Sequence, residues 1–225
     1  MTAERNTFRM TLKQIYAAIY QPFFHKFRSE RLRRMCEVCH ISEHSRILDV
    51  GGSYYTFWAY SPVKPKVTLL NPKASWLQCD EPGFSTMLGD GRALPFENHS
   101  FDIVVSNSVI EHLGEWHQQK IFADEIRRVG RSYWVQTPSR TFFVEPHFLA
   151  PLIHFLPKKY RKLLARHFTV WGLTVRPTPK QVDEMVEEIS LLNKPEVQQL
   201  FPDASIICEK WCGMTKSIIA CRLQS

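Results

Sequence analysis

Long apolar runs are missing from this sequence of 225 residues. No stretch approaches the roughly 18 uninterrupted apolar residues that a membrane-spanning helix needs. The first ten residues, MTAERNTFRM, also lack the apolar segment of a secretory signal peptide. Because nothing marks the chain for a membrane or for export, we expect a cytoplasmic protein.

A disulfide framework is not expected either, although the chain has six cysteines, because disulfides are rare in proteins that are not exported. The segment CEVCH, from Cys36 to His40, matches the attachment pattern of c-type haem, but that chemistry requires export. A zinc site there would need at least two more ligands. His44 is close in the sequence, and Cys208 and Cys212 could join in space. We expect reduced thiols and no metal.

Acidic residues are outnumbered, since 29 basic and 22 acidic side chains give a net charge of +7. Such an excess permits an anionic partner, such as nucleic acid, a phospholipid surface or a phosphorylated substrate. An ordinary solvated surface explains the charge as well. Repeats and low-complexity segments are absent, and 44% hydrophobic residues suffice for one core in a single domain.

Glycine is scarce, yet two of the nine glycines stand together at Gly51-Gly52, directly after the apolar run that contains Leu48 and Val50. A buried strand that ends in glycines is typical of a nucleotide-binding corner, because a residue without a Cβ lets the backbone approach a ligand closely. Asn71 lies twenty positions after Gly51, where such folds place the side chain that holds a ribose.

Three further blocks follow at regular spacing: GDGRALPF from Gly89, SFDIVVSN from Ser100 and VIEHL from Val109. Together with the LDVGG segment, they resemble the class I S-adenosylmethionine-dependent methyltransferases, in particular the small-molecule branch that includes quinone and sterol methyltransferases. The resemblance is specific from about residue 45 to 140 and looser toward the C-terminus.

This resemblance implies S-adenosylmethionine as cofactor and assigns residues to it. Asp49 and the two glycines would line its methionine and ribose side, with Ser53 where the family usually has another glycine. Asn71 replaces the usual acidic residue at the ribose. The remaining assigned positions are Asp90 and Gly91 at the adenine and Asn107 at the methionine end.

The alternation of apolar strands and amphipathic helices predicts an α/β fold, a Rossmann-like doubly wound and mostly parallel sheet. The expected strands are 47–50, 66–70, 84–88, 101–106, 133–135, 204–208 and 217–223, and the clearest helices are 116–129 and 181–192. We also expect a short helix opening at Tyr54. The resemblance adds an antiparallel C-terminal hairpin strand, an N-terminal helical lid and an insertion after the fifth strand.

The predicted organisation is one domain over residues 1–225, with the lid at 1–44, the cofactor core at 45–140, the insertion and its helix at 141–200 and the last strands at 201–225. Tyr16, Tyr20 and Phe24 in the lid could line the acceptor side or pack as plain core. The basic residues Arg28, Arg31, Arg33 and Arg34 are expected to form a solvated face.

Methyl transfer mainly requires alignment of the acceptor and exclusion of water, and an amine or hydroxyl acceptor must also lose a proton. His112 follows the fourth strand, and Glu145 and His147 lie in the insertion, so these three are the candidate catalytic residues; core or capping roles remain open. Some related O-methyltransferases bind a divalent metal through Glu-x-x-Glu-His. Ser108 stands at the first of those positions, which argues against a metal.

The sequence therefore predicts methyl transfer to a small-molecule or biosynthetic-intermediate acceptor, at oxygen or nitrogen. An RNA methyltransferase is one alternative, motivated by the basic clusters, although no RNA-binding domain or amino-methylation motif is visible. A non-catalytic cofactor-binding scaffold is another. Peripheral contact with a membrane surface, the acceptor and the oligomeric state stay open.

Overall fold

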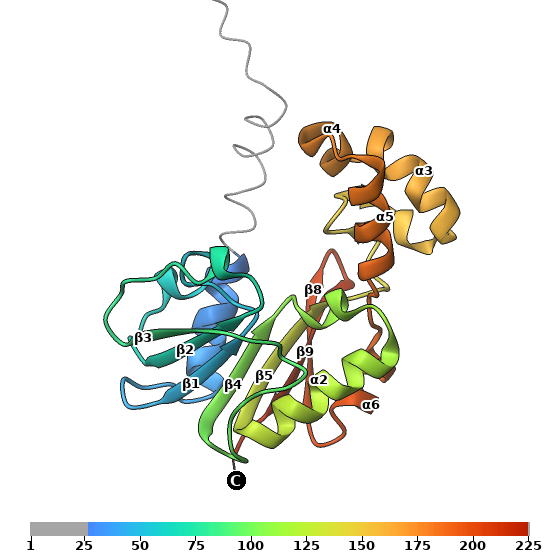
Figure 1. The fold of residues 1–225 in the computed structure, drawn as a ribbon. Helices are drawn as coiled ribbons and strands as arrows, with labels where there is room; N and C mark the ends of the chain where they lie inside the picture. Colours follow the sequence, from blue (N-terminus) through green and yellow to red (C-terminus); the bar gives the residue numbers. More distant parts are fainter. Residues whose placement is uncertain (1–26, 225) are drawn as a thin grey trace, which may run out of the picture.

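The computed structural model describes residues 27–224 of the chain, and the expected lid residues Tyr16, Tyr20 and Phe24 lie outside this range. Its centre is a seven-stranded sheet with the order β3-β2-β1-β4-β5-β9-β8 (Figure 1). These strands are β1 Arg46–Val50, β2 Lys66–Asn71, β3 Phe84–Leu88, β4 Phe101–Asn107, β5 Gly130–Pro138, β8 Ser205–Trp211 and β9 Met214–Arg222.

The first five of these strands pair in parallel, whereas β9 runs antiparallel to β5 and forms a hairpin with β8. The predicted mostly parallel sheet with an antiparallel C-terminal strand is thus confirmed. The carboxyl ends of β1, β2, β3 and β4 lie along one edge, which we call the cofactor edge. Four of the residues assigned to the cofactor, Asp49, Asn71, Asp90 and Asn107, stand in or just after these strand ends.

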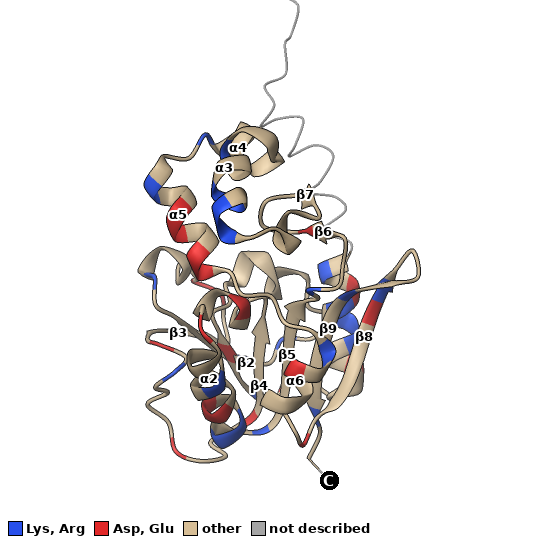
Figure 2. Cartoon of the chain, turned by 90° about the vertical axis from the view of Figure 1, so that its right-hand side faces the viewer, with Lys and Arg blue, Asp and Glu red and all other residues tan. Residues whose placement is uncertain are grey.

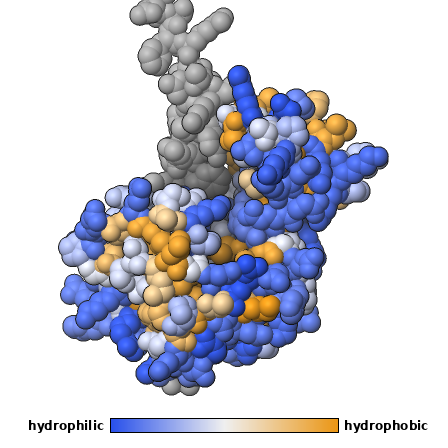
Figure 3. Space-filling model, in the orientation of Figure 1, coloured by the Kyte–Doolittle hydropathy of each residue, from blue (hydrophilic) through white to orange (hydrophobic). Residues whose placement is uncertain are grey.

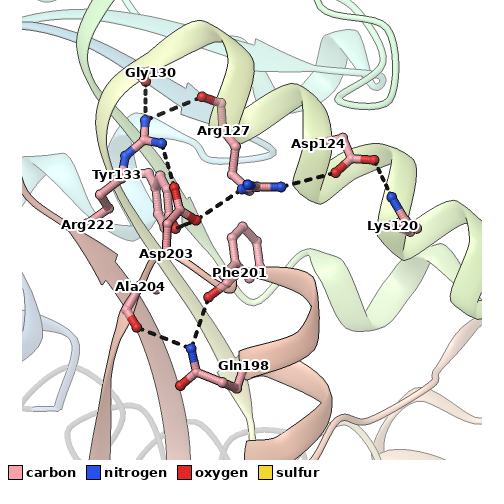
Figure 4. A network of polar contacts seen from close by, with 10 residues as sticks. All are labelled: Lys120, Asp124, Arg127, Gly130, Tyr133, Gln198, Phe201, Asp203, Ala204 and Arg222. Atoms are coloured by element: carbon pink, nitrogen blue, oxygen red, sulfur yellow. Dashed lines mark hydrogen bonds and ion pairs between the residues drawn. The ribbon is translucent and has the colours of Figure 1, made fainter.

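Two apolar layers cover the sheet. On one face α2 (Trp116–Val129) and α6 (Lys194–Leu200) pack against the buried side chains of the central strands. The other face is covered by a helix over residues 27–38, with Leu32 and Met35 fully buried, and by the aromatic segment around Trp58. A polar network ties the first of these layers together (Figure 4).

The centre of that network is Asp203, which precedes β8. It accepts hydrogen bonds from the hydroxyl of Tyr133 at 2.7 Å, from Arg222 at 2.7 Å and from Arg127 at 3.0 Å. Burial alone would raise the pKa of Asp203, but these donors outweigh it and hold the pKa at about 2. The network therefore fixes the C-terminal end of α2 against β5 and β9.

A short helix does begin at Tyr54, as expected, but it is a 3-10 helix. Tyr54–Thr56 and a second 3-10 helix, Trp58–Tyr60, follow the glycines in place of a regular α-helix. Phe57 and Trp58 turn into the core beneath the sheet, which leaves the chain no length for a regular helix before Pro62.

The segment after β5 forms a separate layer at the carboxyl end of the sheet (Figure 1). It contains the two-stranded β6 (Val144–Glu145) and β7 (Ala150–Pro151), a 3-10 helix at Ile153–Phe155, and the helices α3 (Lys158–Phe168), α4 (Val170–Val175) and α5 (Pro179–Glu188). Lysines of α3 face acidic residues of α5, as in the pairs of Lys158 and Lys162 with Glu187 (Figure 2).

The helix expected over residues 181–192 ends earlier, at Glu188. Ile189, Leu191 and Leu192 are buried in extended chain that returns to the sheet. The backbone N–H of Ser190 donates to the carbonyl of Glu111, so this return anchors the insertion beside β4. Among residues 27–224, no helix has the length and apolarity needed to cross a bilayer.

Candidate cofactor edge and acceptor-side cluster

Asp49, the penultimate residue of β1, is 1% exposed. Its Oδ2 accepts a 2.7 Å hydrogen bond from the indole Nε1 of Trp58, whereas its Oδ1 is buried with no hydrogen-bond partner in the described part of the chain. Burial raises the pKa of Asp49 to about 7, although the hydrogen bond from Trp58 opposes this. Trp58 could not be selected from the sequence, because only the folded chain brings it under the strand.

The two glycines are required where they stand. Gly51 has a φ of +84°, which L side chains rarely adopt, and a Cβ at Gly52 would lie 1.9 Å from Oδ2 of Asp49. Any side chain at Gly52 would therefore displace the carboxylate. Ser53 is buried in extended conformation and its hydroxyl pairs with Thr56, so the missing third glycine leaves the turn intact.

Asn71 is buried at the end of β2, and its side chain is bonded to the backbone. Nδ2 donates to the carbonyl oxygens of Gly51 at 3.0 Å and Gly52 at 3.3 Å, and Oδ1 accepts from the N–H of Lys73. In this structure Asn71 fixes the glycine turn. Its contact with a ribose stays a prediction.

The loop after β3 is held in a similar way. Both carboxylate oxygens of Asp90 accept hydrogen bonds from Arg92, and these lower the pKa of Asp90 despite partial burial. A Cβ at Gly91 would lie 2.5 Å from the Phe122 ring and 2.6 Å from Val50. Gly91 therefore lets the loop pack directly on α2 and β1, and the adenine contact of Asp90 stays a prediction.

Asn107, at the end of β4, is held by a residue that the sequence placed in solvent. Its Oδ1 accepts a 2.8 Å hydrogen bond from Nη1 of Arg31. The same Nη1 donates to Gln136, and Nη2 of Arg31 forms a 2.6 Å ion pair with Glu209. Arg31 is only 6% exposed. The expectation that all four arginines of this helix are solvated is therefore wrong for Arg31, which joins the ends of β4, β5 and β8.

The three candidate catalytic residues meet at the carboxyl end of β4, with the insertion against them. Nδ1 of His147 donates to Oε1 of Glu145 at 2.6 Å, and Oε2 of Glu145 accepts from the N–H of Phe148. His112 lies with its ring edge-to-face against His147, at 4.7 Å between centroids, and its Nδ1 is 2.8 Å from Glu188. The structure thus joins two histidine–carboxylate pairs.

Glu111 completes this group, and we call Glu111, His112, Glu145, His147 and Glu188 the acceptor-side cluster. Glu111 is 0% exposed, its Oε2 accepts from Thr137, and its Oε1 lies 3.9 Å from Nε2 of His147. Sequence reasoning used Glu111 only as part of the VIEHL block. Its role could not be found there, because Thr137 and His147 reach it from β5 and the insertion.

Electrostatics within the cluster are dominated by the three carboxylates. Burial lowers the pKa of His147, but the hydrogen bond to Glu145 and the nearby charges of Glu111 and Glu188 outweigh it, so the pKa is raised above its usual value. The hydrogen bond from His112 lowers the pKa of Glu188.

Figure 3 shows apolar residues exposed at the junction between the core and the insertion, next to the cofactor edge.

No curated protein matches the sequence, but residues 48–132 match a protein-family model described as a methyltransferase domain. Solved structures with a similar fold include a SAM-dependent methyltransferase from Methanosarcina mazei, with 16% identity, a TM-score of 0.50 and coverage of 82% of this chain and 95% of that one. A SAM-dependent methyltransferase from Aquifex aeolicus shares 12% identity, with a TM-score of 0.50 and coverage of 84% and 86%.

A third similar structure is a putative O-methyltransferase from Nostoc punctiforme, with 13% identity, a TM-score of 0.56 and coverage of 94% of this chain and 60% of that one. At these identities the structures establish the fold alone. The methyltransferase domain model matches the part of the chain that forms the cofactor edge. Residues 48–132, which include the cofactor edge, therefore match a methyltransferase domain, and the findings support an S-adenosylmethionine-dependent methyltransferase with S-adenosylmethionine as cofactor.

Proposed function

We propose that this methyltransferase acts on an oxygen or nitrogen atom of a small molecule or biosynthetic intermediate, and that the acceptor approaches at the acceptor-side cluster. One observation carries the proposal: His147 and His112, each held by a carboxylate, meet buried Glu111 at the end of β4, next to the cofactor edge. Carboxyl ends of parallel strands are where open α/β sheets bind ligands.

The cofactor edge has a buried group that fits this cofactor. Oδ1 of Asp49 is a buried acceptor without a donor, and leaving it so costs free energy. An ammonium or a hydroxyl of the cofactor would satisfy it. When bound, S-adenosylmethionine supplies a methyl group activated by a sulfonium. Asp49, Gly51, Gly52 and Ser53 would hold the methionine and ribose side.

The remaining cofactor contacts are carried over from the family resemblance. Asn71 would contact the ribose, Asp90 and Gly91 the adenine, and Asn107 the methionine end. Each of these residues stands at the carboxyl end of β2, β3 or β4, so all can face one extended ligand along the cofactor edge.

On the acceptor side, His147 is proposed to contact the acceptor atom through Nε2, which the bond from Nδ1 to Glu145 leaves available. Glu145 positions the ring, and His112 packs against its face. His147 is 16% exposed, so a molecule at the junction with the insertion can reach it. A purely structural role is the competing explanation, because Glu145 also binds the backbone of Phe148.

The experiment uses S-adenosylmethionine carrying a labelled methyl group, the intact chain, and a cell extract separated into small-molecule and RNA fractions. Label in the small-molecule fraction is expected. His147→Ala should then lower the transfer rate by roughly 10²–10⁴-fold, the range for loss of a group that handles the proton, with cofactor affinity nearly unchanged. If the variant only melts at a lower temperature while the folded fraction turns over normally, His147 is structural.

RNA is a second candidate acceptor, favoured by one feature of the insertion. From residue 146 to 182 the sequence has no acidic residue and seven lysines and arginines. Label in the RNA fraction, with acceptor binding that weakens steeply as salt rises, would establish this alternative, because phosphate contacts release counterions. Label in neither fraction, together with cofactor binding, would favour a non-catalytic scaffold.

A further inference from the structure

Three side chains of the acceptor-side cluster present ligand atoms to one point. Glu111 and His112 lie in the 3-10 helix Ile110–Leu113 that follows β4, and His147 comes from the segment between β6 and β7. One ligand atom from each lies within 4.8 Å of the others. The chain thus brings a carboxylate and two imidazoles together from segments that are far apart in the sequence.

Oε1 of Glu111 is unsatisfied at this point. Its partner oxygen Oε2 accepts a 2.9 Å hydrogen bond from Thr137, but Oε1 is buried and has no hydrogen-bond partner among residues 27–224. Nε2 of His147 lies 3.9 Å from Oε1, too far for a hydrogen bond. A buried carboxylate oxygen without a donor is costly, and a cation between the two atoms would remove that cost.

Both histidines are oriented by a carboxylate behind them. Nδ1 of His147 is 2.6 Å from Glu145, and Nδ1 of His112 is 2.8 Å from Glu188. A proton on Nδ1 leaves the Nε2 lone pair of each ring free for a ligand, and metal-ligating histidines nearly always show this arrangement. His154, elsewhere in the insertion, has only a backbone carbonyl at Nε2 and no carboxylate partner.

Charge leads to the same conclusion. Two carboxylates, Glu111 and Glu145, are buried beside the rings at 0% and 1% exposure. Glu188, by contrast, is half exposed and lies near Lys73. Buried carboxylates are normally compensated by a counter-charge. A divalent cation at the shared point would supply it while using the ring nitrogens in their neutral form.

We infer that Oε1 of Glu111 and the Nε2 atoms of His112 and His147 bind one divalent transition-metal ion, with zinc as the best match. Two imidazoles and one carboxylate suit zinc and its neighbours, whereas magnesium and calcium prefer oxygen ligands. Bonds of about 2.1 Å in a tetrahedral site separate ligand atoms by roughly 3.4 Å. The observed separations exceed this, and small rotations of two partly exposed rings would close the site.

This site shares Glu111 and His112 with the Glu-x-x-Glu-His pattern that the sequence argued against, but it lacks the first ligand of that pattern. Ser108, at the first position of the Glu-x-x-Glu-His pattern, donates its hydroxyl to Gln136 at 2.9 Å and takes no part in the cluster. The third ligand comes from the insertion instead. Three protein ligands leave a coordination position open, as in catalytic zinc sites, and the partial exposure of both rings leaves that position accessible to an acceptor. With the ion bound, Nε2 of His147 would be a ligand and would no longer be free to take a proton from the acceptor.

The test measures metal binding, not turnover, so its outcome is independent of the proposed acceptor chemistry. Tag-free wild-type chain is stripped with chelator and titrated with zinc by calorimetry, and with cobalt by absorption spectroscopy. One ion per chain is expected, with a cobalt spectrum that lacks thiolate charge-transfer bands. Glu111→Gln and His147→Ala should each weaken zinc binding by at least 100-fold. Glu145→Gln should weaken it by roughly 10–100-fold, as loss of an outer partner does.

His154→Gln is the matched control and should bind zinc like the wild type. His112→Ala is a further ligand variant, in case Glu111→Gln or His147→Ala fails to fold. Because the ring of His112 is partly exposed, this variant is expected to fold, and its zinc affinity should be equally reduced. Failure of the folded wild-type chain to bind zinc or cobalt at about 100 micromolar metal, which corresponds to a binding free energy weaker than about −5.5 kcal/mol, would overturn the inference. Binding that is unchanged in Glu111→Gln, His112→Ala and His147→Ala, or a thiolate-type spectrum, would overturn it equally.

Discussion

The indole of Trp58 donates a 2.7 Å hydrogen bond to Asp49, and among residues 27–224 no second donor reaches the buried carboxylate. The other oxygen, Oδ1, is buried without a donor from the described part of the chain. Unsatisfied buried groups of this kind are often found at functional sites, and the proposed contact with the cofactor would supply the missing donor.

Stability should consequently depend on pH through Asp49. Its pKa is about 7 in the folded chain and near the ordinary value of 3.8 in the unfolded chain. Below pH 3.8, Asp49 is protonated in both the folded and the unfolded chain. As the pH rises from there, the unfolded chain releases the proton of Asp49 first. The stability that protonated Asp49 contributes is therefore lost progressively and is gone above about pH 7. Thermal unfolding without cofactor, measured between pH 4 and 8, should show this loss.

Asp49→Asn should remove that pH dependence and raise the melting temperature of the free protein at pH 8. The same change should weaken S-adenosylhomocysteine binding by about tenfold or more, the loss of a charge-assisted hydrogen bond. Asp80→Asn, at an exposed loop position, is the control and should change neither. If Asp49→Asn lost stability at pH 8 and kept its affinity, Asp49 would be structural only.

Asn71→Asp tests the glycine turn. The family usually has an acidic residue here, and the sequence suggests that an aspartate would keep or improve cofactor affinity. The structure predicts the opposite, because Asn71 donates to two carbonyl oxygens that a carboxylate would repel. We expect a loss of about 1–3 kcal/mol in the free energy of unfolding, measured by urea denaturation.

The matched control is Asn98→Asp. The side chain of Asn98 accepts a hydrogen bond from Arg128, so a carboxylate there should be neutral or slightly stabilising. Equal stability of Asn71→Asp and the wild type would show that the turn does not depend on these two hydrogen bonds.

Arg31→Met should cost about 3–5 kcal/mol, because it leaves Glu209 partly buried without its counter-charge. Arg33, two residues along, pairs with Glu37 in solvent, and Arg33→Met should cost less than about 1 kcal/mol. Chemical denaturation of both variants separates the two arginines. Similar losses would mean that Arg31 is as solvated as its neighbour.

These two arginines also show what sequence could and could not predict. Local patterns located the strands of the parallel sheet and the helix over residues 116–129 with its observed bounds, because apolar periodicity and glycine stops act over short distances. Nothing local distinguishes Arg31 from Arg33. Their difference depends on β8 and β5, which reach the helix only in the folded chain.

The same limit applies to the site. The strand ends were predictable, so the residues of the cofactor edge were found together. Glu111 was not selected, since its partners Thr137 and His147 come from other segments, and neither was Trp58, since the glycine turn was expected to open a helix. Asn71 was selected for a ligand contact, whereas the contacts that the structure shows are to the backbone of the turn.

Titration calorimetry of S-adenosylhomocysteine into the folded wild-type chain tests the cofactor assignment most directly. We predict one binding site per chain, a melting temperature that rises with ligand concentration, as it must for a ligand of the native state, and weaker binding by Asp49→Asn. Absence of binding at millimolar ligand, with a protein that circular dichroism and a cooperative melt show to be folded, would contradict the assignment.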